Sequence, residues 1–379
     1  MIELETLEQF DRHVQAVSDL RNTVLQSLDL RERAAVLRSV PVDGAVLLGC
    51  RLDDETVGSV VRRRAMVFPR FEDLPYNPYR AALYTPEELY AGFDPAEPDT
   101  YAATLDARVY LHFRKEGGGS PTSIREALAQ RLHDHAVSDA LEELLAGEGK
   151  ARKVVAMMGG HGMNRGDDAY RTVAWIAREL ARRGYLVATG GGPGAMEAAH
   201  LGVFFAARDD ADLQTAIDVL ACAPSYKDRH WLSKAFEVRR RWPLSDVAGA
   251  RFPSLGIPTW YYGHEPPNAF ATHIAKYFAN SIREDGLLTI ARHGVIFSPG
   301  SAGTVQEVFQ DACQNHYHSV GVISPMIFLG EAYWKWNKPV FPLLAQLAAG
   351  SDYARLLFIT DSPQEVIRRI ETFAREAAA

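Results

Sequence analysis

The fold is decided by the stretch Tyr185-Leu-Val-Ala-Thr-Gly-Gly-Gly-Pro-Gly194, in which a short apolar run passes directly into glycines. An apolar run without alternation is typical of a strand buried on both faces of a parallel sheet. The residues that follow, Ala195-Met-Glu-Ala-Ala-His200, are expected to begin a helix. The stretch therefore predicts one strand–turn–helix unit.

The same order of elements recurs along the chain. Lys153-Val-Val-Ala-Met-Met158 ends in two glycines and precedes an expected helix that Asp167 or Asp168 can cap. Further strands are expected at 257–262, 294–298, 326–329 and 356–359, with a long helix over roughly 269–290. Because strands that alternate with helices predict an α/β fold, we expect residues 151–379 to form a Rossmann-like, doubly wound sheet with at least five parallel strands.

The first 150 residues lack this regular alternation. Expected strands at 44–49, 64–68 and 107–113 are mixed with expected helices at 7–20, 85–92 and 122–146. We therefore predict an additional N-terminal α+β domain over residues 1–150, which ends at the glycine-containing stretch Leu145-Ala-Gly-Glu-Gly-Lys150. No motif indicates its chemistry, and regulation by a nucleotide effector and a role in assembly are both open hypotheses.

Composition limits the classes of function. The 379 residues are 47% hydrophobic, and 41 Lys and Arg against 48 Asp and Glu give a net charge of −7, which argues against a nucleic-acid-binding protein. Cys50, Cys222 and Cys313 show no spacing typical of a disulfide framework or a zinc site. The acidic first residues and the lack of an apolar run near the length of a membrane helix predict a cytoplasmic protein without a membrane partner.

Two glycine-rich turns are the candidate ligand site. Each is expected between a strand and a helix N-terminus, where unpaired N–H groups and the helix dipole favour a phosphate. The alternative explanation is that glycines in such turns serve only to allow a tight backbone turn. The presence of two such turns at one edge of the sheet favours the phosphate hypothesis. The candidate substrate-binding residues are Gly190, Gly191, Gly192, Gly194 and Met196 at the first turn, Gly300, Ser301, Ala302, Gly303 and Thr304 at the second, and Asp311 on the helix that follows it.

Acidic side chains follow the second turn on its expected helix. Glu307, Asp311 and Gln314 recur at the spacing of one helix face, opposite an apolar stripe that includes Val308 and Ala312. A carboxylate at Glu307 can reach the ribose of a bound nucleotide or hold a water near its anomeric carbon. Acids in a first helical turn are also common because they favour the helix dipole.

The helix expected over 269–290 carries a polar stripe of His273, Lys276, Asn280 and Arg283. A solvated face is the ordinary explanation for such a stripe. If the stripe instead faces the cleft, Arg283 is suited to a forked contact with a phosphate or a base.

Other chemical signals are weaker. Gly190-x-Gly192-x-x-Ala195 satisfies a relaxed dinucleotide fingerprint, with Asp209, Asp210 or Asp212 near the distance of a ribose-binding acid. However, that fingerprint belongs to the first strand–helix turn of a domain rather than the second. His133-Asp-His135 lacks a third ligand, so we expect no metal site.

The two turns carry a family resemblance. Thr189-Gly-Gly-Gly-Pro-Gly-Ala-Met-Glu-Ala198 and Pro299-Gly-Ser-Ala-Gly-Thr-Val-Gln-Glu307 resemble the paired motifs of the LOG ("lonely guy") family, once named lysine-decarboxylase-like. The resemblance covers roughly residues 150–379. The stretch from Asn268 to Gly286 and the additional N-terminal domain look more like the long bacterial branch, which includes nucleotide 5′-monophosphate nucleosidases, than the short cytokinin-activating enzymes.

This resemblance implies cleavage of the N-glycosidic bond of a nucleoside 5′-monophosphate to a free base and ribose 5-phosphate, without a cofactor. The family's essential Glu corresponds to Glu307, and Arg283 is the nearest match to its essential Arg. Ser301 replaces the second Gly of the motif, which puts substrate choice and rate in doubt. The family also implies a homodimer or a larger even homo-oligomer, whereas no lysine motif supports a pyridoxal-phosphate decarboxylase.

Two other classes of function remain open from the sequence. A nucleotide-binding carrier or sensor would use the same cleft without chemistry. A nicotinamide-dependent oxidoreductase would require the dinucleotide fingerprint to be real, and we do not expect it. Within the nucleosidase hypothesis, Arg283 either anchors the phosphate or steadies the departing base.

Overall fold

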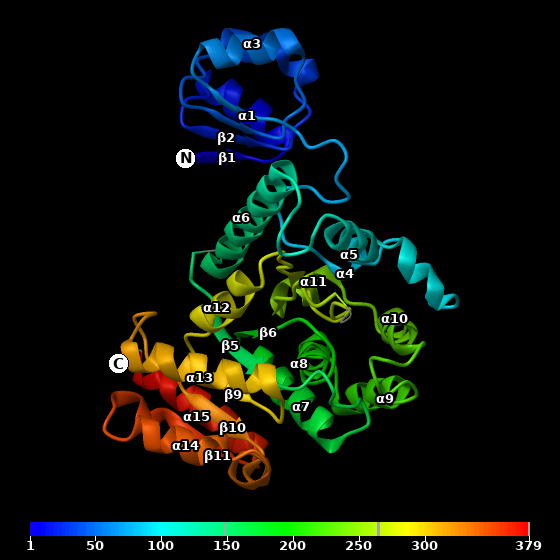
Figure 1. The fold of residues 1–379 in the computed structure, drawn as a ribbon, viewed down its shortest axis with the longest axis vertical. Helices are drawn as coiled ribbons and strands as arrows, with labels where there is room; N and C mark the ends of the chain where they lie inside the picture. Colours follow the sequence, from blue (N-terminus) through cyan, green and yellow to red (C-terminus); the bar gives the residue numbers. More distant parts are fainter. Residues whose placement is uncertain (148, 264–265, 378–379) are drawn as a thin grey trace. The chain divides into compact units, whose positions relative to one another are not determined.

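The computed structural model describes residues 1–147, 149–263 and 266–377. The chain divides into two compact units (Figure 1). The first consists of Met1–Leu83 and His112–Glu143, and the second of Tyr84–Leu111 and Leu144–Ala379.

The first unit alternates strands with helices, and its strands all pair in parallel in the order β1-β2-β3-β4. Its elements are β1 (Ile2–Leu4), α1 (Leu7–Val17), β2 (Thr23–Gln26), α2 (Ala34–Ser39), β3 (Val46–Leu48), α3 (Asp54–Arg62), β4 (Met66–Phe68) and most of α6 (Ile124–Ala146). Local sequence determines the start of α1, because Thr6 and Gln9 form a reciprocal capping box. Phe10 on α1 then packs with Leu25 and Leu47 of the sheet in one apolar core.

The second unit contains the predicted doubly wound sheet. Among the described residues it has seven parallel strands in the order β11-β10-β9-β5-β6-β7-β8. The strands are β5 (Lys153–Met158), β6 (Tyr185–Thr189), β7 (Ser254–Gly256), β8 (His273–Ile274), β9 (Val295–Phe297), β10 (Met326–Leu329) and β11 (Leu357–Thr360). The chain order reverses between β5 and β9, and ligands of open α/β sheets bind at the carboxyl ends of the strands at such a reversal.

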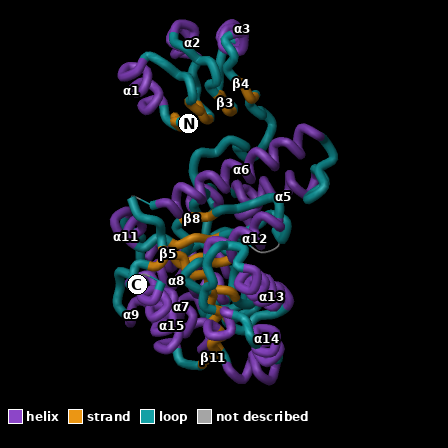
Figure 2. Tube along the Cα trace, turned by 90° about the vertical axis from the view of Figure 1, so that its left-hand side faces the viewer, coloured by secondary structure: helices purple, strands orange, loops and turns teal. Residues whose placement is uncertain are grey.

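Helices cover both faces of this sheet. The α-helices of the second unit are α4 (Pro86–Leu89), most of α5 (Leu105–Lys115), α7 (Asp168–Arg182), α8 (Ala195–Phe204), α9 (Asp210–Leu220), α10 (Trp231–Arg241), α11 (Asp246–Arg251), α12 (Asn280–Ile290), α13 (Ala302–Tyr317), α14 (Val340–Ala348) and α15 (Pro363–Glu376). Helix α7 contacts α8 and α15, whereas α13 contacts α12 and α14. Figure 2 shows the strands between these two groups of helices. Helix α7 buries Tyr170, Val173, Ile176 and Leu180, the periodic stripe that such a position requires.

The two units divide the chain differently from the predicted boundary at residue 150. Residues 84–111 belong to the second unit, because Tyr84 and Ile274 exchange backbone hydrogen bonds of 2.9 and 2.8 Å and the buried Asp106 pairs with the buried Lys276. The second segment of the first unit ends at Glu143, close to the predicted boundary.

Three predicted elements differ in the structure. Residues 107–113 lie in helix α5, so the strand predicted there is wrong. The helix predicted over 269–290 begins only at Asn280, because the preceding residues run extended along the sheet as β8 and a bridge between Thr259 and Tyr277. The strand predicted at 257–262 lies earlier, at β7, since Pro258 has no N–H to continue the ladder.

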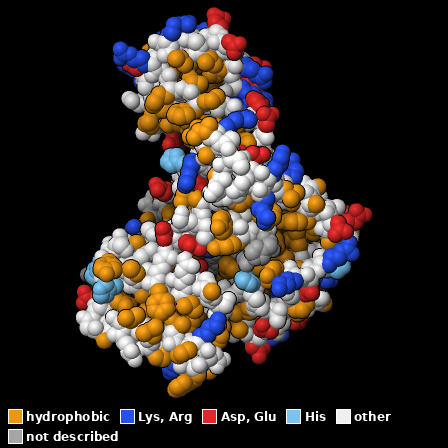
Figure 3. All heavy atoms as spheres, in the orientation of Figure 1, with side chains coloured by type: hydrophobic (Ala, Val, Ile, Leu, Met, Phe, Trp, Pro, Cys, Tyr) orange, Lys and Arg blue, Asp and Glu red, His pale blue; other side chains and the backbone are white. Residues whose placement is uncertain are grey.

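The described part of the chain contains no helix with the length and apolar character needed to cross a membrane. On the face shown in Figure 3, Lys and Arg are interspersed with Asp and Glu, and hydrophobic side chains gather over α13 and α14. Exposed large hydrophobic residues of this region are Tyr317, Trp336, Leu343 and Leu347.

Candidate functional site

Three turns meet at the carboxyl edge of the second sheet. The Gly159-Gly160 turn after β5 joins the other two, because Gly160 donates to Pro299 O (3.0 Å) and accepts from Ala195 N (3.2 Å). Gly194 has a φ of +70°, and a Cβ on it would lie 2.3 Å from Gly160 O. This close packing requires glycine. The two predicted glycine turns therefore lie on either side of β5, at the same edge of the sheet.

These turns border a cleft of about 440 Å³. The predicted site residues that line it are Gly190, Met196, Arg283, Ser301, Ala302, Gly303, Thr304 and Glu307. Of the described residues, Gly191, Gly192, Gly194 and Gly300 shape the turns without lining the cleft. The sequence-based prediction missed Gly159, Gly160, His161, Tyr262 and Glu284, which also line it.

The first turn is held by a buried hydroxyl. Thr189 Oγ1 accepts from Gly191 N (2.9 Å) and lies 2.8 Å from His200 Nε2. Burial lowers the pKa of His200 to about 3, so the imidazole is neutral at physiological pH. Asn268 adds a second support, because its N–H donates to Gly191 O (2.8 Å) and its side chain amide donates to Gly192 O. The turn is thus fixed by side chains behind it.

The second turn is fixed in a similar way. Trp334 is fully buried, and its indole N–H lies 3.1 Å from both Phe297 O and Leu329 O, at the ends of β9 and β10. Tyr333 and Lys338 both donate to Gly300 O. Neither Trp334 nor Tyr333 carries a recognisable signal in the sequence.

Helix α13 begins at this turn and points its N-terminus into the cleft. The first N–H groups of a helix have no intrahelical acceptor, and the Ser301 side chain does not cap them. Because Ala302, Gly303 and Thr304 line the cleft, their amides and the positive end of the helix dipole are available to an anion.

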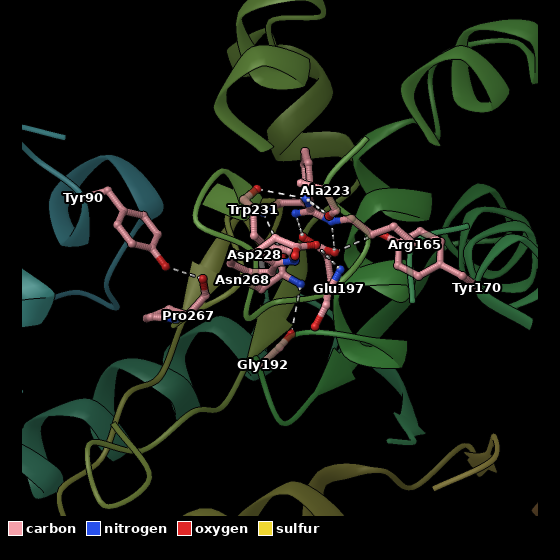
Figure 4. A network of polar contacts seen from close by, with 12 residues as sticks. Tyr90, Arg165, Tyr170, Gly192, Glu197, Ala223, Asp228, Trp231, Pro267 and Asn268 are labelled. Carbon is pink, nitrogen blue, oxygen red and sulfur yellow. Dashed lines mark hydrogen bonds and ion pairs between the residues drawn. The ribbon is translucent and has the colours of Figure 1, made fainter. Parts of the chain in front are cut away.

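A buried ion pair anchors the N-terminus of α8. Arg165 and Glu197 are 1% and 0% exposed and form a forked pair at 2.6 and 2.8 Å. Arg165 also donates to Ala223 O and Trp231 O, and Tyr170 donates to Glu197. Figure 4 shows these side chains turned toward one another, with Asn268 reaching Gly192 nearby. The network ties the loop after β5 to the helix after β6.

Glu307 and Arg283 lie together in the cleft. Glu307 Oε1 is 3.9 Å from Arg283 Nη1, and their side chains are 15% and 13% exposed. Glu284 lies beside them, and its Oε1 is 3.3 Å from Arg283 Nη2. The pKa of Glu307 is raised to about 7, chiefly by burial; Arg283 opposes this rise and Glu284 adds to it. Among the residues that the structure describes, no hydrogen bond reaches the Glu307 carboxylate, which leaves it available to a ligand.

Asp311 does not belong to this cleft as predicted. It lies on the buried side of α13 with 3% of its surface exposed, and Asp311 Oδ2 has no hydrogen-bond partner. Burial raises its pKa to about 8. The residues on α13 that pack inward include Thr304, Val308 and Asp311 at four- and three-residue steps, so Asp311 follows the core stripe rather than Glu307.

The polar stripe predicted on one helix is divided in the structure. Asn280 and Arg283 lie on α12, whereas His273 lies on β8 and Lys276 pairs with Asp106 in the core. The solvated-face interpretation of Lys276 is therefore wrong.

The acids considered for a dinucleotide site have other partners. Asp209 caps α9, Asp210 pairs with Arg178, and Asp212 accepts from Trp242 Nε1 (2.8 Å). They stand at a helix N-terminus rather than at a strand end, which does not fit a ribose-binding acid.

In the described part of the first unit, Glu3, Glu5 and Glu143 place carboxylate oxygens within 4.8 Å of one another. Burial and the neighbouring acids raise the pKa of Glu5 to about 6. Partial protonation therefore relieves the repulsion within this cluster, and acidic clusters of this kind are common on proteins without a bound cation.

Comparison with known proteins finds distant matches of fold. No protein-family model matches the chain, and no curated protein does. A solved molybdenum cofactor binding protein from the phototrophic bacterium Rippkaea orientalis is 16% identical, with a TM-score of 0.38, over 59% of this chain and 98% of its own. The Moco carrier protein from Chlamydomonas reinhardtii is 13% identical, with a TM-score of 0.35, over 59% and 99%. Likeness at this level concerns the fold alone, so the resemblance to the LOG family rests on the two motifs.

Proposed function

We propose that this chain hydrolyses the N-glycosidic bond of nucleoside 5′-monophosphates to a free base and ribose 5-phosphate. The observation that carries the proposal is the position of Glu307. Its carboxylate has no described hydrogen-bond partner, faces a cleft bordered by two anion-suited turns, and lies one turn along α13 from the amides suited to a phosphate.

The cleft suggests a division of roles. The amides at the start of α13 and the Gly190 turn would hold the 5′-phosphate and so place the ribose near Glu307. A carboxylate with a pKa near 7 is partly ionised at neutral pH, where it can accept a proton from water or stabilise positive charge on the sugar. In the overall reaction, hydroxide adds to C1′, the C1′–N bond breaks, and the water's second proton goes to the base.

Arg283 is better placed for the phosphate than for the base. Its Nη1 lies so close to the first turn that a Cβ on Gly190 would be 3.3 Å from it. A ligand phosphate at that turn would therefore meet the guanidinium directly. His161 and Tyr262 supply the aromatic walls of the cleft and are the candidates to contact the base.

The test is a panel of purine and pyrimidine monophosphates assayed for release of ribose 5-phosphate. Glu307→Gln should lower turnover by about 10²–10⁴-fold while nucleotide affinity changes little, because the amide keeps the shape but cannot accept the proton. Gln310→Ala, on the same helix outside the cleft, is the control and should retain activity. Wild-type turnover in Glu307→Gln would contradict the catalytic role.

A carrier that binds a phosphorylated ligand in the same cleft is the second candidate. Ser301 favours it, because this residue lines the cleft at the position where the family motif has Gly, and its hydroxyl would offer an additional ligand contact. Stoichiometric binding of a monophosphate without release of ribose 5-phosphate from any member of the panel would establish the carrier over the hydrolase.

A further inference from the structure

Glu284 is a cleft residue for which the proposed mechanism has no role. It lies on α12 directly after Arg283, and its side chain is 19% exposed. Glu284 Oε1 accepts from Asn280 Nδ2 (2.7 Å) and from Arg283 Nη2 (3.3 Å). Glu284 Oε2 accepts from Gln306 Nε2 (3.1 Å) on α13. Three donors therefore hold this carboxylate, and it links the two helices that border the cleft.

These contacts determine where Arg283 points. Arg283 Nε donates to Asn280 Oδ1 (3.2 Å), and the amide nitrogen of Asn280 is itself held by Glu284. Asn280, Arg283 and Glu284 thus form a closed ring of hydrogen bonds. With Nε and Nη2 engaged, Nη1 is the part of the guanidinium directed toward Glu307 and the Gly190 turn. Since Arg donors have a fixed planar arrangement, fixing two of them fixes the third.

We propose that Glu284 is a positioning residue that orients Arg283 so that Nη1 meets the phosphate ester of the ligand. This inference rests on the proposed function, because it takes a sugar phosphate as the ligand of the cleft. Glu284 acts through Arg283, and its own carboxylate is already occupied by protein donors.

The charge of Glu284 gives the proposal a second readout. The other charged and titratable side chains that line the cleft, among the described residues, are Arg283 and Glu284 of α12, His161 of the turn after β5, and Tyr262. Because Glu284 raises the pKa of Glu307, removing its charge lowers that pKa. The acidic limb of the kcat/KM profile then moves to lower pH, since Glu307 ionises more readily.

The chain offers a matched control on the same helix. Asp285 is exposed, lies next to Glu284, and accepts from Gln310 of α13, so it also links α12 to α13. It does not line the cleft. Asp285→Asn therefore removes an equal charge at a contact between the same two helices without touching Arg283.

The experiment compares wild type, Glu284→Ala, Glu284→Gln and Asp285→Asn. Calorimetry with ribose 5-phosphate as the probe should show about tenfold weaker binding in Glu284→Ala, because Arg283 loses its restraint. Glu284→Gln keeps an acceptor for Arg283 and should bind within about threefold of wild type, with the acidic limb of its pH profile displaced downward. Asp285→Asn should match wild type in both measurements.

Wild-type affinity in Glu284→Ala, or an equal loss in Asp285→Asn, would overturn the positioning role. An unmoved pH profile in Glu284→Gln would also count against it. If wild type releases no base from any nucleotide but binds ribose 5-phosphate, the proposed hydrolysis fails while the binding comparison still tests Glu284. If wild type binds no ribose 5-phosphate, the positioning role fails, while release of ribose 5-phosphate from the nucleotide panel still decides the proposed hydrolysis.

Discussion

Asp311 shows how one residue can oppose the stability of a fold. Its carboxylate is buried on α13 without a partner for Oδ2, and burial raises its pKa from 3.8 to about 8. Between these values the folded chain binds a proton that the unfolded chain has lost. The folded state is therefore favoured at low pH, and its stability falls as the pH rises through this window.

We predict that Asp311→Asn is more stable than wild type at pH 8.5. The gain should be roughly 1–3 kcal/mol, because the amide stays neutral where the buried carboxylate must ionise. At pH 5 the gain should be smaller, since only the lowest part of this window has then been crossed. Thermal denaturation at both pH values measures this, with the exposed Asp285→Asn as control. A variant that is less stable than wild type at pH 8.5 would contradict the burial argument.

At the scale of elements, α8 depends on a charge pair behind the cleft. Glu197 stands in its first turn, and Arg165 reaches it from the loop after β5. Both side chains are buried, so removing one charge leaves the other without compensation in a medium that solvates it poorly.

Glu197→Gln should therefore lower the free energy of unfolding of the second unit by about 3–5 kcal/mol. The matched control is Glu331→Gln, which forms a partly exposed pair with Lys335, and such a pair is worth about 0–1 kcal/mol. The melting temperatures of the two variants, compared with wild type, measure the difference. Equal small losses in both variants would show that the Arg165 network does not anchor α8.

The elements near the site were the most predictable ones. Strands β5, β6 and β10 occupy the predicted residues, and α7 and α8 begin where the caps and glycines indicate. A continuous apolar run that ends in glycine is enough to predict such a strand, because a strand buried on both faces has no polar position. The prediction that both glycine turns open on one cleft with Arg283 and Glu307 is confirmed as geometry, while their catalytic roles stay predictions.

The predictions failed where distant contacts decide the local structure. Residues 269–279 carry apolar side chains at helical spacings, which led to the predicted helix. In the structure nearly all the other positions of this segment are buried too. His273 and Ile274 pair with β7, and this pairing holds the segment extended. The sequence around Lys276 indicates an exposed side chain. Its partner Asp106 is 170 residues away, so no local pattern reveals the buried pair. His161 and Glu284 enter the cleft only because α12 and the turn after β5 meet there.

At the scale of the whole molecule, the two compact units do not follow a single cut in the sequence. Residues 84–111 lie between two segments of the first unit in the chain but belong to the second. Their buried Asp106 pairs with Lys276, accepts from Trp260 Nε1 (3.2 Å) and from Tyr101 (2.8 Å). Burial lowers the pKa of Lys276, and Asp106 opposes this shift. The cytoplasmic location, the effector and the homo-oligomer stay predictions.

A fragment of residues 151–379, which the sequence-based boundary would select as the catalytic domain, therefore lacks the partner of a buried ammonium. We predict that it is much less stable than the second unit within the full chain, or insoluble. In the full chain, Asp106→Asn should lower the free energy of unfolding by about 3–5 kcal/mol, because it leaves the buried Lys276 ammonium without a counter-charge. The double variant Asp106→Leu with Lys276→Met removes both charges and should recover much of that loss. Thermal denaturation of the four proteins measures this order, and a fragment that melts cooperatively at the temperature of the full chain would contradict it.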